Sequence, residues 1–111
     1  MLRQDPLIKV PQKIGGRIPG GWAAYARRSH LFIKKFPYEP LGIYPDFGSN
    51  AEMFTNEWML EVESLSPMRK LSPGQAVEQI EDWYLFREVP TPHNDTQIER
   101  HVLTKLLETG V

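Results

Sequence analysis

Residues 22–36 read WAAYARRSHLFIKKF, and this stretch decides the fold class. Aromatic and β-branched residues occur in both of its halves, and a short polar break at Arg28-Ser29 separates them. Such residues favour strands, and a break of this length favours a tight hairpin. The stretch therefore predicts two antiparallel strands, 22–28 and 30–36.

Further strand patterns follow toward the C-terminus. Residues 51–55 and 58–65 predict two more strands, and in the second of them Glu61 and Glu63 alternate with apolar residues. Residues 67–71 predict a short edge segment, and Ser72-Pro73-Gly74 predicts a turn. Residues 76–87 then predict one long strand, so that strands account for most of residues 22–89.

The two ends of the chain differ from this pattern. Residues 1–21 are rich in Pro, Gly and Lys, which predicts a loop-rich segment with one short strand near 7–10. Residues 93–109 predict a C-terminal helix, from about 95 to 107, because Asn94 or Asp95 can cap it and Gly110 can end it. Its apolar stripe comprises Ile98, Val102, Leu103, Leu106 and Leu107.

Length and composition set the class of protein. The chain has 111 residues, of which 41% are hydrophobic and 24% charged, so we expect one soluble globular domain over 1–111. It contains no cysteine, which excludes disulfide scaffolds, zinc–thiolate sites and thiol nucleophiles. No segment is apolar enough for a signal peptide or a membrane span, so we expect a cytoplasmic protein without a membrane partner.

Charge is distributed unevenly along the chain. Residues 1–35 hold eight Lys or Arg and one acid, a net charge of +7, whereas residues 36–111 carry a net charge of −8. A basic half is typical of nucleic-acid binding, but these basic residues are spread out and match no nucleic-acid motif. We therefore expect no nucleic-acid partner. We expect instead that the basic residues of 1–35 and the acidic residues of 36–111 neutralise each other's charge, within one chain or between two copies.

Few residues are candidates for chemistry. Glu61 and Glu63 are expected on one face of a central strand, and Glu52 on the preceding strand can join them. Paired carboxylates suit acid–base work and the binding of sugar hydroxyls, although a solvated sheet face also explains this spacing. Tyr38 and Tyr44 lie in a long loop and are candidates for stacking on a ligand. The three histidines have no partner at ligand spacing, so we expect neither a metal nor another cofactor.

The order of several segments points to a family. These segments are Gly-Trp-Ala-Ala-Tyr at 21–25, Phe-Ile-Lys at 32–34, Tyr-Pro-Asp at 44–46, Glu-Met-Phe-Thr-Asn at 52–56 and Leu-Ser-Pro-Gly-Gln at 71–75. In this order they resemble the C-terminal half of the galactose mutarotase-like (aldose 1-epimerase) superfamily. The similarity covers about residues 7–87 and is greatest to a branch without an assigned activity.

The resemblance implies an all-β fold, namely an antiparallel β-sandwich that is half of a mutarotase-like supersandwich, with one C-terminal α-helix. It also implies sugar binding on the sheet. The catalytic glutamate of the epimerases falls on Glu63, with Glu61 as the alternative. Glu52, Glu61, Tyr44, Asp46 and Tyr38 become the implied ligand-binding residues. The catalytic histidine of the epimerases has no counterpart in this chain.

We therefore expect a carbohydrate-binding module that is non-catalytic. The alternatives are a structural or oligomerisation protein that uses its sheet for assembly, and an aldose 1-epimerase-like isomerase. A half-sandwich leaves strand edges and an apolar face uncovered, and such edges pair with other strands. The sequence therefore also predicts a homodimer or a higher homo-oligomer.

Overall fold

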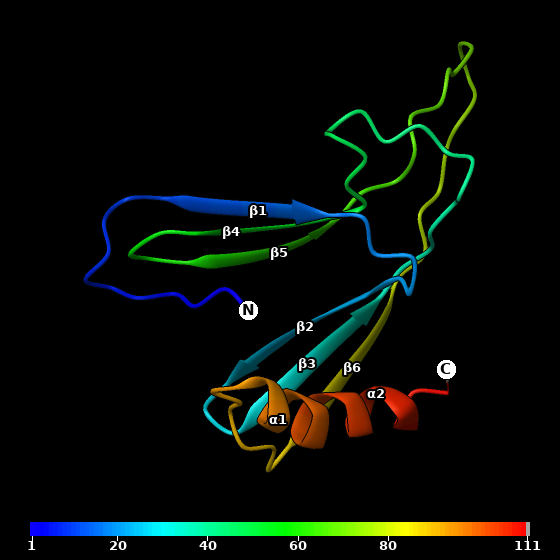
Figure 1. Ribbon diagram of the computed structural model, residues 1–111. Helices are drawn as coiled ribbons and strands as arrows, with labels where there is room; N and C mark the ends of the chain where they lie inside the picture. The colour runs from blue at the N-terminus through cyan, green and yellow to red at the C-terminus, as the bar shows by residue number, and fades with distance from the viewer. Residues whose placement is uncertain (111) are drawn as a thin grey trace. The chain divides into compact units, whose positions relative to one another are not determined.

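The computed structural model describes residues 1–110 and shows a mostly β protein with one C-terminal helix (Figure 1). Six antiparallel strands form two three-stranded sheets, which confirms the predicted fold class at this level. The chain divides into two compact units, one of Met1–Gly21 with Phe36–Ile80, the other of Trp22–Lys35 with the described residues from Glu81 on. The sheet predicted over 22–89 is thus divided between two units. That the whole chain acts as one domain, or as half of a sandwich, stays a prediction.

The second unit contains the predicted hairpin. Strands β2 (Trp22–Arg27) and β3 (His30–Lys35) pair antiparallel, and β6 (Asp82–Arg87) pairs with the other side of β3. Arg28 and Ser29 connect β2 to β3 with φ angles of 48° and 59°. Positive φ at both central residues is the mark of the type I′ turn, whose twist matches that of the flanking strands. The expected tight hairpin is confirmed.

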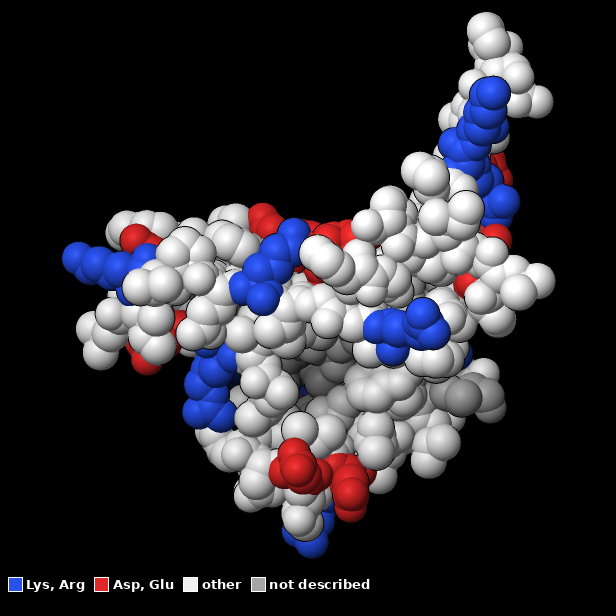
Figure 2. Space-filling model, turned by 45° about the horizontal axis from the view of Figure 1, so that its top comes forward, with Lys and Arg blue, Asp and Glu red and all other residues white. Residues whose placement is uncertain are grey.

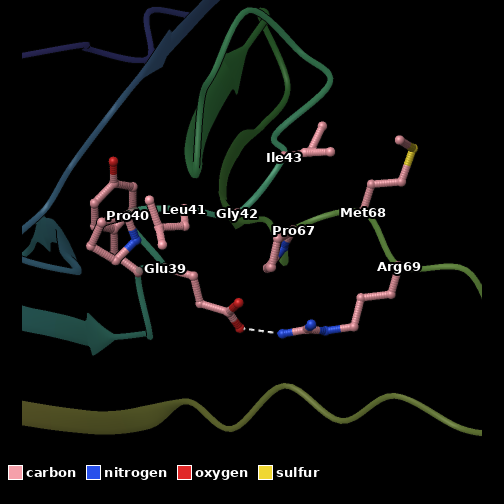
Figure 3. Close-up of a pocket in the computed structure, with 9 residues that line it drawn as sticks. Glu39, Pro40, Leu41, Gly42, Ile43, Pro67, Met68 and Arg69 are labelled. Atoms are coloured by element: carbon pink, nitrogen blue, oxygen red, sulfur yellow. Dashed lines mark hydrogen bonds and ion pairs between the residues drawn. The ribbon is translucent and has the colours of Figure 1, made fainter.

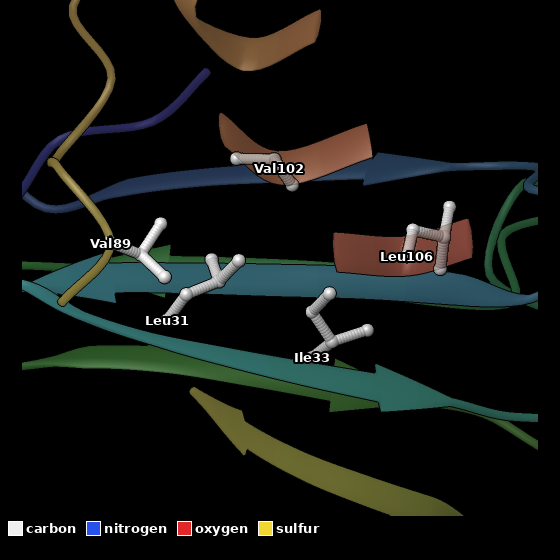
Figure 4. Packing of buried hydrophobic residues seen from close by; sticks show 5 residues of the cluster. All are labelled: Leu31, Ile33, Val89, Val102 and Leu106. Atoms are coloured by element: carbon white, nitrogen blue, oxygen red, sulfur yellow. The ribbon is translucent and has the colours of Figure 1, made fainter. Parts of the chain in front are cut away.

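The helix covers one face of this sheet. It runs from Asp95 to Glu108 as α1 (Asp95–Ile98), a π-helical turn η1 (Glu99–Leu103) and α2 (Thr104–Glu108). Asn94 caps it, because its Oδ1 accepts a hydrogen bond of 2.9 Å from the Gln97 amide. The hydrophobic core lies between helix and sheet (Figure 4) and consists of Leu31, Ile33, Val89, Val102 and Leu106. The predicted helix and its cap are confirmed.

The first unit holds the other sheet, in the order β1-β4-β5. Its strands are β1 (Gln12–Gly16), β4 (Ala51–Thr55) and β5 (Leu60–Ser64). Asn56 closes the β4–β5 hairpin, since its Oδ1 accepts hydrogen bonds from the amides of Trp58 and Met59 at 2.8 and 3.0 Å. Trp58 and Met59 therefore belong to the turn, and the strand predicted at 58–65 is shorter than expected.

The prediction of a short strand near residues 7–10 was wrong. Residues 5–8 form a turn there with Pro6 and Leu7 at its centre, and the Asp5 carboxylate accepts a hydrogen bond from the Leu7 amide at 2.9 Å. The strand lies instead at Gln12–Gly16, where the sequence analysis expected a loop because of the glycines. Pairing with β4 supplies the hydrogen-bond partners that make this segment a strand.

Two other predicted strands also differ in the structure. The long strand at 76–87 is a strand only over Asp82–Arg87, because β3 has six residues and offers partners to those six alone. Residues 67–71 form no strand. The turn at Ser72-Pro73-Gly74 is confirmed, with Gly74 at φ +83° and a hydrogen bond of 3.0 Å from the Gln75 amide to the Ser72 carbonyl.

Charged side chains are mixed with uncharged ones on the face that Figure 2 shows. Lysine and arginine lie there singly or in small groups and do not form one continuous basic patch. Among residues 1–110, no helix is both long and apolar enough to cross a membrane.

Candidate functional site

Three of the predicted carboxylates lie together on one face of the first sheet. Glu52 of β4 stands directly opposite Glu63 of β5, and Glu61 lies two residues along the same strand and therefore on the same face. The predicted shared face is confirmed. The expectation that Glu61 and Glu63 lie on a central strand is wrong, because β4 occupies the centre and β5 forms an edge.

Lys13 of β1 lies among these carboxylates. Its Nζ is 2.9 Å from Glu52 Oε2 and 3.7 Å from Glu63 Oε2. The Glu52 side chain is almost fully buried, with 6% of its surface exposed, whereas the Lys13 side chain is 51% exposed. Lys13 therefore neutralises a buried carboxylate from the solvent side. Lys13 was not among the predicted site residues, because residues 1–21 were expected to be mostly loop.

Gly15 provides space for this arrangement. It stands opposite Glu52 in the β1–β4 pairing, and a Cβ at this position would be 2.7 Å from Ser49 Oγ and 3.4 Å from Glu52 Cγ. A side chain here would therefore displace Ser49 or Glu52. The alternation of Lys13 and Gly15 along β1 is the sequence signal for this part of the site, and it can be used only if residues 12–16 are recognised as a strand.

Asp46 joins the cluster from the loop before β4. Its carboxyl lies close enough to that of Glu52 for each to shift the pKa of the other. The fully buried Asn50 fixes the start of β4, since its side chain accepts a hydrogen bond of 2.6 Å from the Ile18 amide and donates one of 3.0 Å to the Ile18 carbonyl. Asp46, Glu52, Glu61, Glu63 and Lys13 are called the carboxylate cluster below.

The carboxylate cluster shifts the acidity of its members in opposite directions. The hydrogen bond with Glu52 raises the pKa of Asp46, and hydrogen bonds from Asp46 and Lys13 lower the pKa of Glu52. Burial, followed by the hydrogen bond with Glu61, raises the pKa of Glu63. The hydrogen bond with Glu52 raises the pKa of Lys13. The titration of each carboxyl group in the cluster therefore depends on the charge of its neighbours.

These shifts determine how the cluster affects stability at different pH values. Glu52 has a lowered pKa in the folded chain, so its contribution is present above its ordinary pKa and is lost as the pH falls through the folded value. Asp46 and Glu63 behave in the opposite way, because their pKa values are raised. They favour the folded chain below their ordinary pKa values, and this effect is lost as the pH rises through the raised values.

Replacing Lys13 by methionine is expected to raise the pKa values of Glu52, Glu63 and Asp46, since Lys13 favours the ionised form of all three. Carboxyl carbon chemical shifts followed by NMR during a pH titration measure these values directly. The matched control is Lys70→Met, at an exposed lysine, which leaves them unchanged. Unchanged pKa values in the Lys13 variant would contradict the geometry of the cluster.

The two tyrosines predicted to bind a ligand contact each other. Tyr38 and Tyr44 stack with ring centroids 5.8 Å apart and an angle of 17° between the rings. Tyr44 is buried, and its hydroxyl oxygen accepts a hydrogen bond of 3.0 Å from the Glu39 amide. Tyr44 therefore holds the loop together, and Tyr38 is the half-buried member of the pair.

Tyr38 also borders a hollow of about 650 Å³ in the same unit (Figure 3). An ion pair between Glu39 and Arg69 lies along one side of it, as the dashed line in Figure 3 marks. The other lining residues are Pro40, Leu41, Gly42, Ile43, Pro67 and Met68. None of the residues lining this hollow belongs to the carboxylate cluster, and the sequence analysis predicted only Tyr38 among them.

Comparison of the chain with protein-family models, curated proteins and solved structures finds no match. Within residues 1–110, no group of three or more His, Asp or Glu side chains is arranged to hold a metal ion. The fold and the carboxylate cluster together define a mostly β protein with a C-terminal helix and a group of carboxylates and one lysine on one of its two sheets.

Proposed function

We propose that this protein binds a carbohydrate at the carboxylate cluster. The observation that carries the proposal is the placement of Glu52, Glu61 and Glu63 on one face of two adjacent strands, with Lys13 within ion-pair distance. Carboxylates accept hydrogen bonds from sugar hydroxyls, and an ammonium group donates to hydroxyl and ring oxygens. Acceptors and a donor at cross-strand spacing suit neighbouring hydroxyl groups on one sugar ring.

An exposed aromatic side chain beside the cluster supports the same proposal. Phe47 follows Asp46 directly, has φ +50° and is fully exposed. A positive φ costs a bulky residue about 1 to 3 kcal/mol, and residues held in this way are concentrated at functional sites. The apolar face of a sugar ring packs on an aromatic ring while its hydroxyls remain free for the carboxylates.

The acidity of Glu63 favours a second candidate function, an aldose 1-epimerase-like isomerase. Burial raises the pKa of this carboxyl, which makes its ionised form a stronger base than an ordinary glutamate. A base of this kind can remove the proton from an anomeric hydroxyl. The resemblance to the mutarotase-like superfamily also implies this role for Glu63.

Binding is tested with a glycan array, followed by titration of the sugars that bind, with free D-galactose and D-glucose included as probes. Glu63→Gln and Glu61→Gln are expected to weaken binding about 10- to 100-fold, the value of one charge-assisted hydrogen bond. The matched control is Glu78→Gln, at an exposed glutamate of the same unit, which leaves binding unchanged.

The same variants separate binding from catalysis. Polarimetry of freshly dissolved α-D-galactose measures mutarotation above the spontaneous rate. A binding module gives no acceleration, whereas an epimerase gives one that Glu63→Gln abolishes. Absence of sugar binding by the unsubstituted chain, or equal binding by the Glu63 and Glu78 variants, would overturn the proposal.

A further inference from the structure

Strand β6 forms an exposed edge of the second sheet. It pairs with β3 on one side only, and the sheet ends there. Trp83 and Leu85 project from β6 on the face opposite the helix, and they are 68% and 70% exposed. In β2, the other edge strand of this sheet, only Arg27 is exposed. The open edge of β6 therefore combines unpaired backbone groups with two large apolar side chains.

Edges of this kind are usually protected, and β6 has charged residues only at its two ends, Asp82 and Arg87. Lysine, proline, glycine and bulges keep edge strands from pairing with other chains, and none occurs within Asp82–Arg87. The edges of the other sheet differ. β1 contains Lys13 and two glycines, and β5 alternates Glu61 and Glu63 along its length. Among the four edge strands of the described chain, β6 is the one most open to pairing.

We propose that β6 pairs antiparallel with β6 of a second copy of this chain, about a two-fold axis at Tyr84. Directly opposite residues in an antiparallel pair point to the same face of the sheet. The register must therefore place residues of the helix-covered face of one copy opposite residues of the helix-covered face of the other. Centring the axis on Tyr84 meets this condition and places Trp83 of each copy opposite Leu85 of the other. The pairing would join the two three-stranded sheets into one sheet of six strands.

Charge complementarity supports this register. If the two strands stay paired for two more residues at each end, Glu81 of one copy lies opposite Arg87 of the other. These two residues point to the same face as Trp83 and Leu85. Glu81 accepts a hydrogen bond of 2.9 Å from Trp83 Nε1 and lies 3.4 Å from Lys34 Nζ. Arg87 is exposed and forms no ion pair within residues 1–110. The pairing would provide a carboxylate for each copy of Arg87.

Light scattering at micromolar concentration tests the association. The unsubstituted chain is expected at twice its mass of 12.9 kDa. Leu85→Lys introduces an edge lysine and is expected to weaken dimerisation at least about tenfold. Leu107→Lys is the matched control, because Leu107 is also 70% exposed but lies on the helix. The mass of a single chain for the unsubstituted protein, or equal effects of the two variants, would overturn the proposal.

Cross-linking tests the register, and the absence of native cysteine makes the result unambiguous. The single variants Trp83→Cys and Leu85→Cys are mixed and oxidised with copper phenanthroline. Opposite residues have Cα atoms about 4.5 to 5.5 Å apart, within the range of a disulfide. The expected product joins position 83 of one chain to position 85 of the other. A product joining only position 85 to position 85, or no product, would refute the register.

Discussion

Gly21→Ala is expected to destabilise the protein by about 3 to 5 kcal/mol and to lower its melting temperature by about 12 °C or more. Gly21 has φ +62°, where an L-residue with a side chain is strained. A Cβ here would also be 2.2 Å from the carbonyl oxygen of Phe36, whose amide donates a hydrogen bond of 2.8 Å to the Gly21 carbonyl. Because the clash is with backbone, no side-chain rotation relieves it. Thermal unfolding followed by circular dichroism measures the effect.

Gly74→Ala is the matched control for this prediction. Gly74 has an even larger positive φ of +83°, but a Cβ there would meet nothing within 4 Å. Its replacement is expected to cost only the backbone strain, about 1 kcal/mol. The difference between the two variants isolates the clash with Phe36. Equal melting temperatures of the Gly21 and Gly74 variants would show that the backbone at Gly21 has a different conformation, without the close approach to Phe36.

Leu31→Ala is expected to cost about 2 to 5 kcal/mol, because it leaves a cavity where the side chain was fully buried. Leu31 lies on β3 within the core that Val102 and Leu106 of the helix complete. We therefore expect the variant to weaken the docking of the helix on its sheet as well as the sheet itself. Faster hydrogen exchange at the helix amides, together with a lower melting temperature, measures both effects.

Leu41→Ala makes the same chemical change at a leucine that is 99% exposed. It is expected to change stability by less than about 0.5 kcal/mol. If the two leucine variants lost similar stability, the core between β3 and the helix would not be the main source of stability in the second unit.

Local signals in the sequence were enough to predict the hairpin and the helix. The polar break at Arg28-Ser29 lies between two runs of strand-forming residues, and a tight turn is the natural connection of that length. Asn94 caps the helix through a hydrogen bond to an amide three residues away. Each feature depends on neighbours in the chain, so the sequence alone predicts it. The same holds for the turn at Pro73-Gly74.

Alternation also predicted part of the candidate site. Glu61 and Glu63 are two residues apart in a strand, so they share a face wherever that strand lies. Glu52 was expected to join them from the preceding strand, and in the structure it lies opposite Glu63. The predicted roles of these residues, and the implied family, stay predictions.

Only the tertiary structure decided the rest of the site. β1 is a strand because β4 lies beside it, although its own sequence is rich in glycine. That pairing brings Lys13 to Glu52 and puts Gly15 where a side chain would collide with Ser49. Likewise, β6 is an open edge because β3 takes one of its sides and no strand of the described chain takes the other. Partners distant in the sequence determine these features, and the local sequence does not encode which partners those are.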